Sequence, residues 1–290
     1  MTGSKSESHR MQCMEVWGGN QAADTSITTT GLDAWVYSRP HRGSETGGGD
    51  VHYISSCASG RLTRLLLADV SGHGASVVDV ARRLRNLMRR HVNVVNPGRF
   101  VRQLNQQFEE GTEVGCFATA LVATYFKLTG KLTLCNAGHP PPLFFNAASN
   151  TWSLLGTPRS RGKVHADLPL GVDKATEYEP FSLRLERGDC VLCYTDAVIE
   201  SLAEDGRQLG QAGLLELARS LDPTNPREAI EQLLNLIMEE RSGNLADDDL
   251  TVLLFRPNDQ RVRLWDTLMS PIRVLVDSFS RRGIKREPLH

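Results

Sequence analysis

The sequence has 290 residues, of which 40% are hydrophobic and 23% are charged, a composition that is ordinary for a globular protein. Its formal net charge of -1 at pH 7 gives no overall field that would favour nucleic acid or an anionic membrane as a partner. No apolar run reaches the roughly 18 residues that a transmembrane helix needs, and the polar start does not resemble a signal peptide. We therefore expect a cytoplasmic protein.

Composition divides the chain into three parts. We expect a disordered segment at residues 1–14, one domain at residues 15–257 and a basic amphipathic tail at residues 258–290. Within the domain, short apolar runs bounded by Gly, Pro and polar residues predict strands. In chain order these runs are 32–37, 51–57, 61–70, 117–127, 131–136, 181–185, 190–194 and 250–256. The run at 61–70 is apolar on both faces, as expected of a strand buried between two layers.

Turn residues between neighbouring runs predict two hairpins, one turning at Thr129-Gly130 and one at residues 187–189. Residues 146–165 are polar and are predicted to form a loop. Apolar residues at helical spacing predict a helix over residues 75–91, and Asn-Pro pairs at 96–97 and 225–226 predict the starts of two more. Hairpin-linked strands with segregated helices are typical of an α+β domain, here with sheets layered between helices.

Two basic segments have alternative interpretations. The arginines of the predicted helix at residues 75–91 are interpreted as a solvated face, with a binding patch as the alternative. The tail carries apolar residues at roughly helical spacing, which favours a helix packed on the domain over a partner-docking segment. The CxxC formed by Cys190 and Cys193 suggests zinc or redox chemistry, but it falls in a predicted strand, where residues three apart point to opposite faces. We expect both cysteines to be core residues and expect no disulfide framework.

Four aspartates share one context, because each lies at the end of a predicted strand or in a tight turn. They are Asp50, Asp69, Asp196 and Asp248. One such aspartate is most simply a turn former, but several carboxylates that converge repel one another unless cations lie between them. Hard oxygen ligands select magnesium or manganese, and two such ions can activate a water and neutralise a phosphoryl group. The pattern therefore predicts phosphoester hydrolysis.

Seven motifs resemble one known family in their order and spacing. They are GGD at 48–50, DVSGHG at 69–74, FATALVATY at 117–125, NAGHPPPL at 136–143, LPLG at 168–171, RGDCVLCYTDAVIES at 187–201 and DDLT at 248–251. Together they look like the SpoIIE/RsbU-type branch of the PPM (type 2C) serine/threonine phosphatases. The resemblance covers roughly residues 32–256 and implies a four-layer α-β-β-α sandwich, with two antiparallel sheets flanked by helix pairs.

The resemblance also implies a site with two Mn2+ or Mg2+ ions, and a third, weaker one as an alternative. Its implied ligands are Asp50, Asp69, the carbonyl of Val70, Asp196 and Asp248, with Asp69 bridging both ions and Asp249 in an outer role or at the third ion. Asp69, Asp50 and His73 are the residues expected to take part in catalysis, His73 as an acid or hydrogen-bond donor. His139 is expected to hold a turn by hydrogen bonds.

Three departures from the family pattern stand out. Tyr53 occupies a position that is usually acidic, and Ala197 replaces the glycine of the usual YTDG. Alanine would be strained if that turn needed a positive φ, but we expect the loop to tolerate it. The N-terminal sensor domain of many relatives is not in this sequence, so we expect signals to come from an upstream sensor or activator protein.

The predicted function is a serine/threonine protein phosphatase. By resemblance, its substrate would be a phosphorylated regulator such as a STAS-type anti-sigma-factor antagonist in a partner-switching circuit, and a homodimer is compatible with the sequence. One alternative is a pseudophosphatase that acts as a signalling binding module. Another is a hydrolase of small phosphoesters, since surface loops and not the ions choose the substrate.

Overall fold

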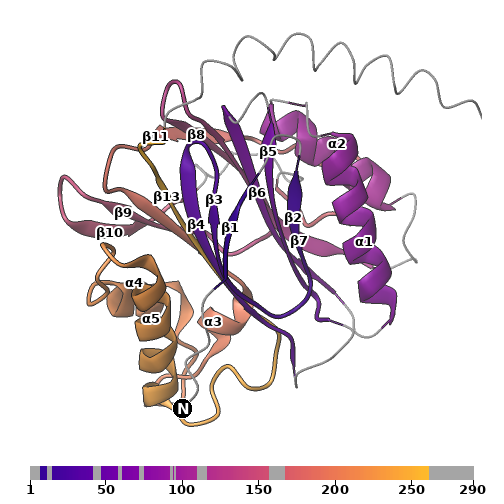
Figure 1. Ribbon diagram of the computed structural model, residues 1–290. Helices are drawn as coiled ribbons and strands as arrows, with labels where there is room; N and C mark the ends of the chain where they lie inside the picture. Colours follow the sequence, from indigo (N-terminus) through magenta and orange to yellow (C-terminus); the bar gives the residue numbers. More distant parts are fainter. Residues whose placement is uncertain are drawn as a thin grey trace, which may run out of the picture.

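The computed structural model describes residues 7–11, 15–41, 47–57, 61–71, 75–91, 94, 96–109, 116–156 and 167–260. Within them, two β-sheets lie face to face (Figure 1). Sheet A has the strand order β1 (Glu7–Arg10), β3 (Ala23–Thr28), β4 (Leu32–Arg39), β13 (Leu250–Pro257), β12 (Cys190–Tyr194), β9 (Leu143–Asn146) and β10 (Thr151–Leu154). Sheet B has the order β11 (Phe181–Arg184), β8 (Lys131–Ala137), β7 (Ala118–Phe126), β6 (Leu62–Val70), β5 (Asp50–Cys57) and β2 (Val16–Gly19).

Helices cover the outer face of each sheet, which confirms the predicted four-layer sandwich. Sheet B carries α1 (Ala75–Arg90) and α2 (Pro97–Glu109), whose apolar stripes pack on one face of its strands. Sheet A carries α3 (Asp196–Glu200), α4 (Gly210–Ala218) and α5 (Pro226–Glu240). None of the helices in the described ranges is long and apolar enough to cross a membrane.

The two sheets enclose a third apolar cluster between them. Strand β6 shows how one sequence serves two layers, because Leu65 and Leu67 pack between the sheets while Leu66 and Ala68 pack under the helices. Alternation along a strand requires this division, and it confirms the predicted burial of the run on both faces. Each layer removes apolar side chains from water, which is the main source of the fold's stability.

The prediction that Cys190 and Cys193 are core residues is confirmed. Cys190 packs with the helices on sheet A, while Cys193 packs between the sheets. Both are free and buried, and burial raises the pKa of the Cys190 thiol to about 12. A strand therefore separates the two sulfur atoms of the CxxC, and the motif is part of the core.

The predicted hairpin between residues 181–185 and 190–194 is wrong. The two strands belong to different sheets, because β11 pairs with β8 of sheet B and β12 pairs with β9 and β13 of sheet A. The connecting turn is held by Asp189, whose carboxylate accepts hydrogen bonds from the backbone N–H of Glu186 at 2.8 Å and of Ala147 at 2.9 Å. Strand β12 is buried throughout, so it fits the centre of a sheet and not a two-stranded ribbon.

Two predictions of irregular structure are also wrong in part. The expected loop at residues 146–165 contains β10, which forms because Trp152 packs beside Phe145 with ring centroids 5.3 Å apart. The expected disorder of residues 1–14 does not hold for β1, which pairs with β3. Residues 1–6, 12–14 and 157–166 and the tail from residue 261 lie outside the described residues, and so does the helix expected in that tail.

Both Asn-Pro helix starts are confirmed, since α2 begins at Pro97 and α5 begins at Pro226. The Asn96 side chain accepts a hydrogen bond from the backbone N–H of Arg99 at 2.9 Å. Asn225 occupies the corresponding position of α5 but makes no such side-chain bond.

Candidate metal centre

Asp50 and Asp69 lie directly opposite each other on neighbouring strands. Asp50 is the first residue of β5, Asp69 is the last but one of β6, and the antiparallel register pairs the two. Opposite residues in such a pair have Cβ atoms only about 4.5–5.5 Å apart. Only 4% of the Asp50 surface is exposed. The sheet thus holds two carboxylates side by side at one end of its strands.

A glycine loop leads into Asp50 and is fastened by Asp249. The Asp249 carboxylate accepts hydrogen bonds from the backbone N–H of His41 at 2.6 Å and of Gly49 at 2.5 Å. A Cβ atom on Gly48 would lie 2.2 Å from Oδ1 of Asp249, and one on Gly49 would lie 3.0 Å from the Val70 carbonyl oxygen. The glycines of GGD therefore make room for a carboxylate and a carbonyl of other segments.

Sheet A contacts Asp50 through the side chain of Thr195. The Thr195 hydroxyl donates to Oδ2 of Asp50 at 2.8 Å, and it accepts a hydrogen bond from the backbone N–H of Thr251 at 3.0 Å. Thr195 follows β12 and Thr251 lies in β13, so one hydroxyl ties both strands of sheet A to a carboxylate of sheet B. A buried carboxylate needs such donors, because an unpaired one is costly.

Asp196 begins α3, directly after Thr195. Ala197 is the second residue of that helix and is not among the residues with positive φ. The expectation that the chain tolerates alanine in place of the family's glycine is therefore confirmed. Asp248 is exposed in the turn before β13 and accepts a hydrogen bond from the backbone N–H of Asp249 at 2.7 Å.

Carboxylates from distant parts of the chain act electrostatically on Asp69. Burial raises the pKa of Asp69 to about 7, with further contributions from the charges of Asp196, Asp248 and Asp249. Burial and the neighbouring Asp69 raise the pKa of Asp50 well above its ordinary value, although the Thr251 and Thr195 hydroxyls oppose that shift. Burial and then Asp248 raise the pKa of Asp196. The four aspartates singled out from the sequence are therefore brought together.

Sequence reasoning missed one further carboxylate in this region. Burial, followed by the charges of Asp196 and Asp248, raises the pKa of Glu200 on α3. No ion pair with Lys or Arg compensates Asp50, Asp69 or Asp196 within the part of the chain that the structure describes. These residues suit a hard divalent cation, because such cations are coordinated by carboxylate and carbonyl oxygens.

The carboxylates are close enough to influence one another's pKa values, but they do not lie at the spacing of metal ligands. Across the described ranges, no group of three or more His, Cys, Asp or Glu side chains has the spacing of a finished metal site. The Val70 carbonyl, another predicted ligand, faces the glycine loop. The residues thus fit a divalent cation in donor type and charge, and their roles as ligands remain predictions. His73 lies outside the described residues.

The NAGH motif supports the same end of sheet B. Asn136 and His139 close a turn, since the backbone N–H of His139 donates to Oδ1 of Asn136 at 2.7 Å and Nδ2 of Asn136 donates to the His139 carbonyl at 2.8 Å. Nδ1 of His139 lies 2.9 Å from the hydroxyl of Thr119, which is the residue paired with Asp69. The expected turn-holding role of His139 is confirmed.

Tyr53 explains why the altered GGD motif leaves the carboxylates in place. Tyr53 lies three residues after Asp50 on the same strand, so it faces the opposite side of the sheet. There it packs in the cluster under α1, and its hydroxyl donates to the Ala81 carbonyl at 2.9 Å. The substitution therefore serves the packing of α1, and Asp50 does not depend on it.

Other residues of the site carried only a weak signal in the sequence. Thr195 and Thr251 adjoin predicted ligands within their motifs, so their positions were visible but their hydrogen bonds were not. Asn20 had no signal, yet its Nδ2 donates to the Gly48 carbonyl at 3.0 Å and its carbonyl accepts from the Gly48 N–H at 2.9 Å.

Comparison with known proteins gives one family for the chain. The family model described as "Stage II sporulation protein E (SpoIIE)" matches residues 59–258. Phosphoserine phosphatase RsbU of Bacillus subtilis is 24% identical over 226 residues, which are 78% of this chain and 63% of that protein. The chain thus spans less than two thirds of the length of this curated relative.

Solved structures share the fold. A crystal structure of the RsbU and RsbW domains of a Mycobacterium tuberculosis protein matches with a TM-score of 0.66 and 23% identity, covering 87% of this chain and 70% of the other. A structure of RsbX in complex with magnesium matches with a TM-score of 0.58 and 14% identity, covering 81% of this chain and 99% of the other. At such identities the likeness concerns the fold.

Proposed function

This chain belongs to the SpoIIE family of type 2C phosphatase domains, and from that premise we propose that it is a metal-dependent phosphatase acting on phosphoserine or phosphothreonine of a regulatory protein. One observation carries the proposal. Asp69 lies opposite Asp50 in the register of sheet B, and its pKa is raised by burial and then by the charges of Asp196 and Asp248, which come from distant parts of the chain.

Divalent Mn2+ or Mg2+, held by these four carboxylates and the Val70 carbonyl, would supply a bound water of lowered pKa and positive charge for the phosphoryl oxygens. The magnesium complex of RsbX, a protein of the same fold, supports this assignment. The third, weaker ion would involve Asp249, whose carboxylate already accepts the backbone N–H groups of His41 and Gly49.

The chain's own residues fix the carboxylates in place. Thr195 orients Asp50 by donating to Oδ2, and Asp249 holds the loop that precedes Asp50. Thr119, held by His139, flanks Asp69 on its other side. Preorganisation of this kind is what lets charged groups act on a developing charge without reorganising.

The substrate proposal rests on the relatives. RsbU and RsbP of Bacillus subtilis, each 24% identical to this chain, are named phosphoserine phosphatases. By analogy, the substrate would be a phosphorylated regulator of the STAS-type anti-sigma-factor antagonist class, dephosphorylated in response to an upstream sensor or activator. The anchored carboxylates favour turnover over a binding-only module.

Hydrolysis of p-nitrophenyl phosphate tests the reaction. We expect turnover with MnCl2, none with EDTA, and a loss of at least about a hundredfold in Asp69→Asn, since residues that merely orient metal ligands are already worth about 10- to 100-fold. Asp79→Asn is the matched control, because Asp79 is exposed on α1 and pairs with Arg82. Metal-independent turnover would contradict the proposal, and so would an Asp69→Asn variant as active as the parent.

A serine-phosphorylated STAS-domain protein and a panel of small phosphoesters then separate the substrate classes. The proposal expects faster turnover of the phosphoprotein. Manganese binding without hydrolysis of any of these substrates would instead support a signalling module that binds and does not react.

A further inference from the structure

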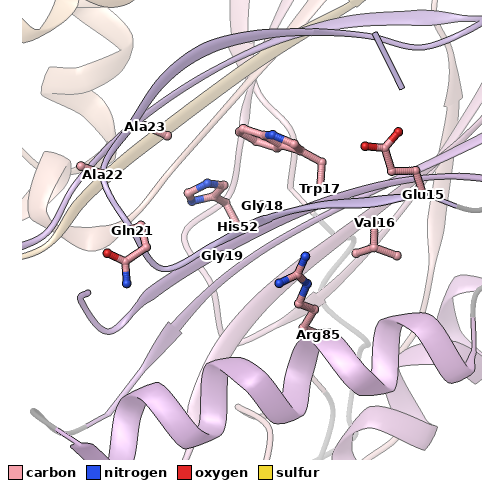
Figure 2. A pocket seen from close by; sticks show the side chains of 10 residues that line it. All are labelled: Glu15, Val16, Trp17, Gly18, Gly19, Gln21, Ala22, Ala23, His52 and Arg85. Carbon is pink, nitrogen blue, oxygen red and sulfur yellow. The ribbon is translucent and has the colours of Figure 1, made fainter. Parts of the chain in front are cut away.

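A pocket of about 360 Å3 opens along β2, the last strand of sheet B (Figure 2). Its walls come from β2 with the residue before it, the turn that follows, the start of β3, β5 and α1. The lining residues are Glu15, Val16, Trp17, Gly18, Gly19, Gln21, Ala22, Ala23, His52 and Arg85. Five consecutive residues, 15–19, belong to one extended segment. A cavity on one face of a strand would be lined by alternate residues, so this hollow follows the strand's open edge.

The edge of β2 is available for pairing. Within the described residues β2 pairs only with β5, so alternate backbone N–H and C=O groups face outward. Gly18 holds β2 tightly against β5, since a Cβ atom there would lie 2.1 Å from the His52 carbonyl oxygen. A Cβ atom on Gly19 would meet no atom within 4 Å. The two glycines thus leave the backbone uncovered by side chains.

Two of the lining residues each have a buried nitrogen atom with no hydrogen-bond partner in the described part of the chain. They are Nε of Arg85 and Nδ1 of His52. His52 is 2% exposed, and its ring lies 5.5 Å from that of Trp17. In Figure 2 the Arg85 guanidinium rises from α1 toward β2. No carboxylate forms an ion pair with Arg85 among the described residues, and a guanidinium is suited to bind one with two parallel hydrogen bonds.

We propose that the edge of β2 binds an extended segment of a partner protein that carries an aspartate or glutamate. The segment would add a strand to sheet B, which is a recurring mode of peptide recognition. Its carboxylate would meet Arg85 on the helix side of the sheet. The next side chain, which alternation turns to the other face, would pack on Trp17, whose ring lies on the side of the core between the sheets.

This edge is connected to the candidate metal centre. Asn20 follows β2 directly, and its side chain and backbone both bind Gly48 in the loop that leads into Asp50. Ordering β2 would therefore steady that loop. This consequence for turnover rests on the proposed phosphatase function, whereas the binding of the segment does not.

The probe is a blocked peptide of the sequence threonine-valine-glutamate-valine-threonine, titrated into the 15N-labelled protein and followed by NMR. We expect saturable shifts of the amides of residues 16–19 and of the Trp17 indole. Peptides with glutamine or lysine in place of glutamate should bind about tenfold more weakly or worse, as expected when a charge-assisted hydrogen bond is lost. Equal affinity for the glutamate and lysine peptides, or shifts confined to other strands, would overturn the proposal.

Two variants and one small anion sharpen this test. Arg85→Gln should remove the preference for glutamate over glutamine, whereas Arg82→Gln should retain it, because Arg82 lies on the same helix but outside the pocket. Unchanged amide spectra away from α1 verify that both variants fold. Glutarate should bind far more weakly than the peptide. If glutarate binds as tightly, the site takes a free carboxylate and the strand-addition proposal fails.

Coupling is tested separately by p-nitrophenyl phosphate hydrolysis with the peptide present. We expect saturating peptide to change kcat in the parent but not in Asn20→Ala, which should still bind the peptide by NMR. Peptide binding that leaves kcat unchanged would overturn the coupling while leaving the binding site in place. A parent that binds the peptide but hydrolyses nothing would count against the phosphatase proposal and not against the edge site.

Discussion

Asp50 and Asp69 stand on adjacent strands of sheet B, whereas Asp196 and Asp248 stand at the start of a short helix and in an exposed turn beside sheet A. The first two can move little, because the strand register and, for Asp50, the Thr195 hydroxyl fix them. Of the second two, Asp248 is exposed to solvent. In the proposed metal centre, sheet B would set the position of the bound charge, and the two aspartates beside sheet A would close the site around it.

Neutralising one carboxylate from each half should have the largest effect. Asp50→Asn should lower the metal-dependent kcat by about a hundredfold or more, and Asp248→Asn by only about tenfold, since water can replace an exposed ligand more readily than a buried one. Hydrolysis of p-nitrophenyl phosphate over a range of MnCl2 concentrations measures both. Equal losses in the two variants would show that the halves are equivalent.

Gly48→Ala tests the glycine loop on the sheet B side. The added methyl would lie 2.2 Å from Oδ1 of Asp249, so either the loop or the carboxylate must shift, at a cost of about 1–3 kcal/mol in the free energy of unfolding. We expect a lower melting temperature and a kcat reduced by about tenfold, as for other disturbed metal surroundings. Gly156→Ala is the control, since its methyl meets no atom within 4 Å, and a loss there as large as in Gly48→Ala would contradict this account.

Thr195→Val removes the hydroxyl that joins the two halves while keeping the side-chain shape. Asp50 loses a donor and the Thr251 N–H loses an acceptor, so we expect the free energy of unfolding to fall by about 1–3 kcal/mol. Thr195→Ser should restore most of it. Urea unfolding of the three proteins provides the measurement, and an equally stable valine variant would show that the hydroxyl does not support Asp50.

His139 contributes an effect that depends on pH. Burial lowers its pKa from 6.5 to about 3, so between these values the unfolded chain binds a proton that the native protein does not. Stability due to this group is therefore complete above about pH 6.5 and falls as the pH drops toward 3, by at most about 1.4 kcal/mol per unit. Urea unfolding at pH 7 and pH 5 should show a smaller decrease for His139→Gln than for the parent. Equal decreases would contradict the lowered pKa.

Much of the fold could be predicted because its strands carry strong local patterns. The run of β6 is apolar on both faces and was recognisable as a buried strand, as was β13. Strands β2 and β3 were missed, since VWGG contains two glycines and ADTSIT is mostly polar, and both compositions weaken a strand signal. Their stability comes from the neighbours with which they pair.

Pairing partners were harder to predict than strands. The segments at 181–185 and 190–194 read as a hairpin because they are close in sequence, yet they lie in different sheets. Nothing local distinguishes a turn that closes a hairpin from one that crosses between layers. The burial of every residue in β12 was the available sign that it lies inside a sheet.

In the candidate site, too, some residues could be predicted from the sequence and others could not. The aspartates could be chosen from the sequence because each follows or precedes an apolar strand within a recognisable motif. Their supports could not, since Asn20, Thr195 and Thr251 act through contacts between segments that are distant in the chain. The ligand roles of the Val70 carbonyl and of Asp249 stay predictions. In the structure, the Asp249 carboxylate also accepts a hydrogen bond from the glycine loop.

Manganese binding by the four aspartates can be measured without any substrate. Titration of the metal-free protein with MnCl2, followed by electron paramagnetic resonance of the free ion, should show saturable binding that Asp69→Asn weakens by about a hundredfold or more, because a lost ligand costs more than a disturbed one. The control Asp79→Asn should bind as the parent does. Binding of equal strength in the parent and in Asp69→Asn would contradict the assignment of these carboxylates as a metal centre.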